Sequence, residues 1–201
     1  MGLFSWFAKA AGPPPLTERV WRDDAARWGG VIRSVREADG ATLLVVFFEA
    51  TAEVARAQLT TAALPFFEVG DTPRPWERGA QVGLVRADRL RFLAGDLPAP
   101  LQVIGAELHP LPAEGRALVG ALASRTAAVP TFHTALDEPL LVLFGGGRIA
   151  EVMDQLGLPR DEPVEHTLVT RSLANAREKL AKSVRNPREA TSMAAWFERN
   201  T

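Results

Sequence analysis

The apolar positions near the start of the chain follow the period of a helix. Thr17 is a typical N-cap residue, and Asp39-Gly40 is a typical helix end. Gly29 and Gly30 interrupt the segment, and each costs an exposed helix about 1 kcal/mol relative to alanine. Five apolar residues recur at helical spacing between these ends: Trp21, Ala25, Trp28, Ile32 and Val35. The pattern therefore predicts a helix that begins after Thr17.

Farther along, the pattern alternates between strands and helices. The run 42–48 is apolar on both faces, which is typical of a central strand covered by helices on both sides. Residues 71–75 are interpreted as a loop. The other predicted elements are strands at 66–69, 82–85 and 102–106, and helices at 52–64 and 113–127. This alternation predicts an α/β fold with a mainly parallel sheet.

The last third of the chain has only helical patterns. From Asp137 onward, the predicted helices are 139–144, 148–156, 167–184 and 188–199. The third of these has an apolar face and a basic face. We interpret the basic face as a solvated surface rather than a binding patch; it carries Arg171, Arg177, Lys179 and Lys182. The chain is therefore divided into an N-terminal stub (1–15), an α/β domain (16–136) and a helical C-terminal extension (137–201).

The stub is apolar and ends in a proline-rich break at residues 12–15, where consecutive prolines hold the chain extended. Its aromatic and aliphatic residues Leu3, Phe4, Trp6 and Phe7 are candidate interaction residues. They could insert into a membrane interface or a groove of a partner protein, or they could fold back onto the domain. The stub lacks the basic start and the cleavage site of a signal peptide.

Composition excludes several kinds of chemistry. The net charge is −1, so bulk electrostatics do not indicate a nucleic-acid-binding protein. The chain has no cysteine, which removes disulfides, Cys-ligated zinc and thiol nucleophiles. The histidines, His109, His133 and His166, are far apart in sequence, and we expect no metal site from them. The longest apolar run is too short to span a bilayer, so the expected location is cytoplasmic.

Two segments carry a resemblance to a known family. Residues 143–176 contain Phe144-Gly145, Arg148-Ile149, a Met-x-x-Leu-Gly, a Glu-Pro-Val-Glu-His and a Val-Thr-Arg in order. This resembles the segment of the SecA preprotein translocase ATPase that leaves the second motor domain and enters the helical scaffold. Residues 103–109 resemble the family's Ile-Ile-Gly-Thr-Glu-Arg-His strand. The resemblance implies a RecA-like fold, with Glu107, His109, Gly120, Phe144, Gly145 and Arg148 as remnants of family positions.

Glu107 and His109 invite a catalytic interpretation as well. They alternate on the predicted strand, so their side chains would point to the same side and could meet a substrate. We favour the simpler interpretation of a hydrogen-bonded strand end. Asp137-Glu138 is an acidic pair, but the resemblance places it at a helix start, where acidic groups interact favourably with the helix dipole.

The chemistry of the family is missing from this sequence. There is no Gly-x-x-x-x-Gly-Lys-Ser/Thr loop to bind phosphates, and the glycines 145–147 lack the Lys-Ser/Thr that would follow. Where the family has two arginines that stabilise the γ-phosphate, this chain has Ala121 and Ser124. We interpret the adjacent Arg125 as a surface arginine rather than a shifted substitute. The preceding family motif is replaced by residues 85–92. Arginine fingers contribute about 10³–10⁵ in rate where they have been measured.

The sequence therefore favours a non-catalytic, SecA-like module that binds another protein and needs no cofactor. The alternative is the second lobe of a split ATPase, completed by a separate chain that carries the phosphate loop. We expect no nucleic-acid partner. Contact with a membrane surface through the stub stays open, and a link to protein translocation rests on the resemblance alone.

Overall fold

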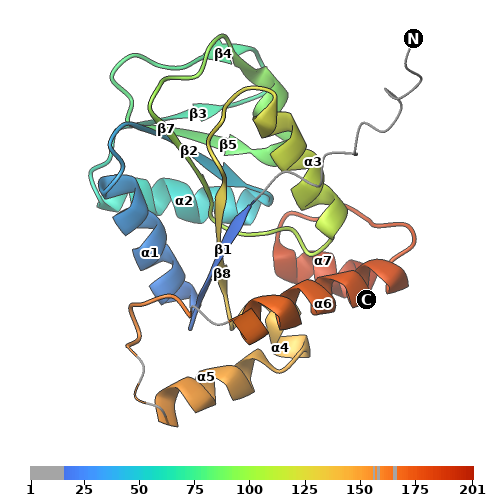
Figure 1. The fold of residues 1–201 in the computed structure, drawn as a ribbon. Coiled ribbons are helices and arrows are strands. Elements are labelled where there is room, and N and C mark those ends of the chain that lie inside the picture. Colours follow the sequence, from blue (N-terminus) through green and yellow to red (C-terminus); the bar gives the residue numbers. More distant parts are fainter. Residues whose placement is uncertain (1–15, 156, 158, 165–166) are drawn as a thin grey trace, which may run out of the picture.

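Six parallel strands form the central sheet of the protein (Figure 1). The computed structural model describes residues 16–201 apart from residues 156, 158, 165 and 166. The strands, in their order across the sheet, are β1 (Thr17–Trp21), β8 (Thr131–Ala135), β7 (Leu101–Gly105), β2 (Ala41–Val46), β5 (Val82–Arg86) and β3 (Phe66–Val69). Each neighbouring pair is parallel. The predicted α/β class with a parallel sheet is therefore confirmed.

Helices cover both faces of the sheet because the central strands are apolar on both sides. In β2, Leu44 and Val46 pack into the core under α1 (Asp24–Arg36) and α2 (Glu49–Thr61). Leu43 and Val45 point the other way, toward α3 (Pro112–Ala123) and the 3-10 helix η1 (Ala87–Phe92). The continuous apolar run of this strand thus fills two separate cores.

The C-terminal third is helical, as predicted. Its helices are α4 (Pro139–Leu143), α5 (Gly146–Gln155), α6 (Thr167–Ser183) and α7 (Met193–Asn200). They pack against the α/β part through a third core cluster, in which Val20 and Phe48 meet residues of all four helices. Figure 1 shows α4 to α7 beside the ends of the strands. The C-terminal helices therefore lie over the carboxyl end of the sheet.

The predicted start of the first helix, just after Thr17, is wrong. Thr17 and Trp21 lie in β1, where they pair with Thr131 and Ala135 of β8. The N-cap is Asp23, whose carboxylate accepts a hydrogen bond from the Ala26 N–H at 2.9 Å. The spacing of Trp21 therefore fitted the helical period by coincidence. Pairing with β8, a strand that the sequence pattern did not predict, decides this edge of the sheet.

Three smaller predictions also change. Residues 74–75 form a two-residue strand, β4 (Arg74–Pro75), paired with β6 (Leu93–Ala94) rather than a simple loop. The last helix begins at Met193, five residues later than predicted, because Ser192 caps it through the Ala195 N–H. Arg177 is not part of a solvated face: its side chain is buried and pairs with Glu18 of β1 at 2.7 Å.

Candidate functional site

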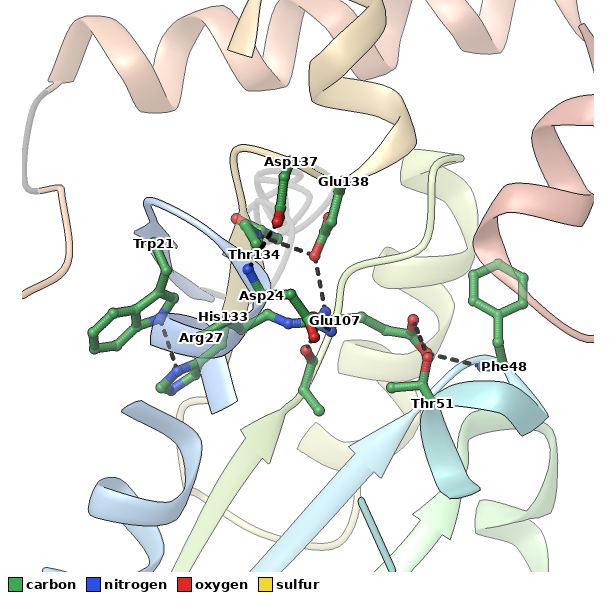
Figure 2. A network of polar contacts seen from close by, with 12 residues as sticks. Trp21, Asp24, Arg27, Phe48, Thr51, Glu107, His133, Thr134, Asp137 and Glu138 are labelled. Carbon is green, nitrogen blue, oxygen red and sulfur yellow. Dashed lines mark hydrogen bonds and ion pairs between the residues drawn. The ribbon is translucent and has the colours of Figure 1, made fainter. Parts of the chain in front are cut away.

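The carboxyl end of a parallel α/β sheet is where ligands usually bind. In this protein a cleft of about 1070 Å³ opens at that end. Its walls come from the β2–α2 turn, η1, α3 and the segment 187–199. Aromatic side chains and both signs of charge line it. A buried polar network lies at the same end of the sheet, and Figure 2 shows part of it.

Glu107 lies at the centre of this end of the sheet and is 1% exposed. One carboxylate oxygen accepts hydrogen bonds from the N–H groups of Phe47 and Phe48, at 2.7 and 2.9 Å. The other accepts one from the Thr51 hydroxyl at 2.7 Å (Figure 2). Burial raises the pKa of this carboxyl. Glu107 thus fills, from within the chain, the place near the N-terminus of α2 where an anion would bind.

His109 lies in an aromatic environment rather than on a strand. The prediction of a shared strand is wrong, because β7 ends at Gly105 and both Glu107 and His109 follow it. The imidazole ring lies 5.5 Å from the ring of Phe48 and 5.6 Å from that of Trp196, between centroids. Its Nδ1 accepts a hydrogen bond from the Leu111 N–H. Burial lowers the pKa of His109 to about 4, so the ring is neutral at physiological pH.

A buried contact between an arginine and a carboxyl group joins α1 to the start of α4. Arg27 donates to Glu138 at 2.9 Å and to the Ala106 carbonyl at 2.9 Å, and it also pairs with Asp24 (Figure 2). Glu138 accepts a further hydrogen bond from the Ala135 N–H. Burial raises the pKa of Glu138 to about 8, although Arg27 acts in the opposite direction. The sequence pattern did not indicate Arg27, since a single arginine on an amphipathic helix carries no sign of burial.

His133 is fully buried on β8. Its Nδ1 accepts a hydrogen bond from the Trp21 indole N–H at 3.0 Å (Figure 2). Burial lowers the pKa of His133 to about 3, and the charges of Arg19 and Arg27 act in the same direction. The two histidines are therefore neutral parts of the packing. Within the described residues, no group of three or more His, Asp or Glu side chains is arranged to hold a metal ion.

Two of the arginines that line the cleft, Arg86 and Arg125, are bonded to groups of the chain itself. Arg86 lies at the end of β5, in the segment that replaces a family motif, and it pairs with Glu49 and Asp88 at 2.7 Å each. Arg56 and Arg86 lower the pKa of Glu49. The pairs continue along the sheet end as one chain of alternating charge: Glu68, Arg56, Glu49, Arg86, Asp88, Arg89 and Asp71.

Arg125 lies at the other end of α3, after its last turn. Its guanidinium donates to two backbone carbonyls, those of Gly95 at 3.0 Å and Leu90 at 3.4 Å. These bonds fasten the end of α3 to η1 and to the segment that follows it. Gly120, on the same helix, is exposed, and a Cβ added there would meet nothing within 4 Å. Arg125 lines the cleft, but its guanidinium is occupied by these two carbonyls.

The remaining family positions lie at the α4–α5 junction. Gly145 has a φ of +89° and ends α4, while a Cβ on Gly146 would lie 2.3 Å from the Leu136 carbonyl oxygen. These glycines therefore serve a tight turn between two helices. Phe144 is 46% exposed and continues an apolar run with Val142 and Leu143, which are 60% and 63% exposed. Arg148 is exposed on α5.

The stub residues Leu3, Phe4, Trp6 and Phe7 lie outside the described residues. Their predicted roles therefore stay predictions. Among the helices that the structure describes, none combines the length and the apolar character needed to cross a bilayer.

Comparison with known proteins identifies relatives of part of this chain. It is 40% identical to the protein translocase subunit SecA of Dechloromonas aromatica over 85 residues, which are 40% of this chain and 9% of that protein. It is 33% identical to SecA of Chromobacterium violaceum over 110 residues, 52% of this chain and 12% of that protein. The chain thus spans about a tenth of the length of these relatives. No model of a protein family matches it.

Two solved structures are similar in fold. The C-terminal part of the Fun30 ATPase domain has a TM-score of 0.45 at 11% identity, over 78% of this chain and 54% of that one. An arterivirus helicase, nonstructural protein 10 with DNA, has a TM-score of 0.43 at 14% identity, over 61% and 29%. The sequence matches show that the chain is partly homologous to SecA, and the predicted resemblance to that family is confirmed over about half of the chain.

Proposed function

We propose that this chain is a non-catalytic, SecA-like module that binds another protein. The observation that carries the proposal is that the side chains of Arg86 and Arg125 are already bonded within the chain. Arg86 is held by Glu49 and Asp88, and Arg125 by two backbone carbonyls. An arginine finger must instead direct its guanidinium at the developing charge of the transferred phosphoryl group. The missing phosphate loop and the buried Glu107 carboxylate at the α2 N-terminus agree with this.

The proposal predicts no ATP hydrolysis above background by the purified chain. Arg125→Ala serves as the test variant and Arg116→Ala as its control, because Arg116 lies on α3, the helix that Arg125 follows, and pairs with the exposed Glu178. All three proteins are expected to be equally inactive in a phosphate-release assay. Turnover that Arg125→Ala removes and Arg116→Ala leaves intact would contradict a non-catalytic role.

The exposed apolar run Val142, Leu143 and Phe144 supports the second half of the proposal. Three adjacent apolar side chains that are 46–63% exposed are a feature of protein-binding surfaces. Leu143→Asp should weaken capture of a partner from the native cell. Val54→Asp is the matched control, because Val54 is 40% exposed on α2, away from this run. Equal capture by both variants would show that the run is not the binding surface.

The alternative is the second lobe of a split ATPase. It predicts a complex with a separate chain that carries a phosphate loop, and the stability of that complex would depend on added nucleotide. Such a complex, together with turnover that neither chain has alone, would replace our proposal.

A further inference from the structure

We propose that the N-terminal segment Leu3–Lys9 is a second ligand for the groove that α7 fills, and that it exchanges with α7 there within one chain. The groove is the apolar surface formed by Phe48, His109, Leu111 and Leu140 at the carboxyl end of the sheet. The inference concerns the two ends of the chain and does not depend on whether the module hydrolyses ATP.

Three side chains attach α7 to this groove. Met193, Trp196 and Phe197 are 8%, 2% and 6% exposed, and they share a core cluster with Phe48 and Leu140. They occupy positions i, i+3 and i+4 of the helix, so they lie on one face. The Trp196 ring also meets His109 edge-on. The groove thus accommodates a helix with a large apolar residue, followed three and four residues later by tryptophan and phenylalanine.

The N-terminal segment repeats this pattern in the same register. Leu3, Trp6 and Phe7 have the spacing of Met193, Trp196 and Phe197. Trp-Phe occurs at these two places and nowhere else in the sequence. A basic residue follows at the same distance, Lys9 in one segment and Arg199 in the other. The structure adds that the three α7 residues in this pattern, Met193, Trp196 and Phe197, are the ones that are buried in the groove.

Helix α7 is also suited to being displaced from the groove by a competing segment. α7 has eight residues, and isolated helices shorter than about 12–15 residues are marginal in water, so the groove supplies its stability. Beyond the apolar contacts, a hydrogen bond from the Ala50 N–H to the Thr191 carbonyl, at 2.9 Å, fastens the segment before α7 to the first turn of α2. Local opening of one short helix requires less free energy than global unfolding.

The linker is long enough for the N-terminal segment to pass back along β1 toward the core cluster that contains the groove. Residues 10–15 connect Lys9 to Leu16, and six extended residues span about 20 Å. Val20 of β1 belongs to the same core cluster as Trp196. Four strand residues separate Leu16 from Val20, a rise of about 13 Å. The linker is thus longer than the strand path back toward this cluster.

Hydrogen exchange of the α7 amides in the full chain tests the proposal. Replacing both Trp6 and Phe7 by alanine removes the competitor and is expected to slow exchange in α7 about threefold or more. Phe4→Ala is the matched control, because Phe4 corresponds to Ala194, which is exposed on α7. It should leave exchange unchanged. A peptide of residues 1–12, added to the double variant, should restore the faster exchange, and the same peptide with both alanines should not.

Several results would overturn the proposal. One is equal α7 exchange in the wild-type chain and the double variant, and another is a Phe4→Ala effect as large as that of the double variant. Exchange that depends on protein concentration would assign the ligand to a second copy instead of the same chain. Loss of flotation with anionic vesicles in the double variant, without a change in α7 exchange, would assign the segment to a lipid surface.

Discussion

Glu107 joins two turns at the carboxyl end of the sheet, because its carboxylate accepts from two N–H groups of the β2–α2 turn and from the Thr51 hydroxyl. Glu107→Ala should lower the free energy of unfolding by about 3 kcal/mol, since it leaves buried donors without acceptors. Glu107→Gln should cost less than about 1 kcal/mol, because its amide can accept from the turn and donate to Thr51. Urea denaturation of both variants measures the difference.

An equal loss in the two variants would show that the charge of Glu107, rather than its hydrogen-bonding geometry, is what the fold needs. An acid–base role in a reaction would make the glutamine variant inactive while it stays stable. The two roles are therefore separable by experiment.

His133 makes stability depend on pH. The pKa of this histidine is about 3 in the folded protein against an ordinary value of 6.5, so the unfolded state takes up its proton first as pH falls. Its contribution is complete above pH 6.5 and is lost as pH falls toward 3. His133→Gln cannot titrate. The stability advantage of the wild-type chain over this variant should therefore shrink by about 2 kcal/mol between pH 7 and pH 5.

The variant is needed as a reference because Glu138 acts in the opposite direction. Its pKa is raised to about 8, so the folded state holds a proton that the unfolded state has lost between about pH 4.5 and 8. Comparison of wild type and His133→Gln at each pH cancels that contribution. A constant difference across the range would show that His133 is not held neutral.

At the scale of elements, the two adjacent glycines of α1 behave differently. A Cβ on Gly30 would lie 2.0 Å from the Trp21 ring, while one on Gly29 would meet nothing within 4 Å. Gly29→Ala should thus raise the free energy of unfolding by about 0.5–1 kcal/mol through helix propensity. Gly30→Ala should lower it by about 1–3 kcal/mol, because the buried indole must move. Thermal denaturation of the pair tests whether Trp21 packs across α1.

The sequence predicted most elements but not the edge of the sheet. The run Thr42–Phe48 was interpreted correctly because a short segment that is apolar on both faces must be covered on both sides, as a central strand is. β1 and β8 are short, and each contains polar residues such as Glu18 and Thr134 that are buried only through their partners. No local pattern distinguishes such strands from helix or loop. The predicted division at residue 136 stays a prediction.

At the scale of the whole molecule, Glu18 and Arg177 join the edge strand β1 to α6. They pair at 2.7 Å between β1 and α6, with side chains 6% and 5% exposed. Arg177→Met leaves Glu18 buried without its partner and should cost about 3–5 kcal/mol. The exposed pair Arg116–Glu178 is the control, and Arg116→Met should change stability by less than about 1 kcal/mol. Both variants are compared by urea denaturation.

A double variant, Glu18→Gln with Arg177→Met, should recover part of the loss, because no buried charge then remains unpaired. Equal losses in Arg177→Met and Arg116→Met would mean that α6 is not held to β1 through this pair. The buried pair could not be predicted from the sequence, since the two residues are 159 positions apart.

The sequence by itself determined the class of fold, the helical C-terminal third and the resemblance to SecA, because these depend on local periodicity and on ordered motifs. It also determined that the phosphate loop is missing. Only the tertiary structure decided what the remaining family residues do. Hydrogen bonds between distant segments make Glu107 the acceptor that stabilises the β2–α2 turn. They also bind the Arg125 guanidinium to backbone carbonyls. The tertiary structure also decided the position of α7. This helix covers the carboxyl end of the sheet because its apolar residues pack against residues far away in the chain.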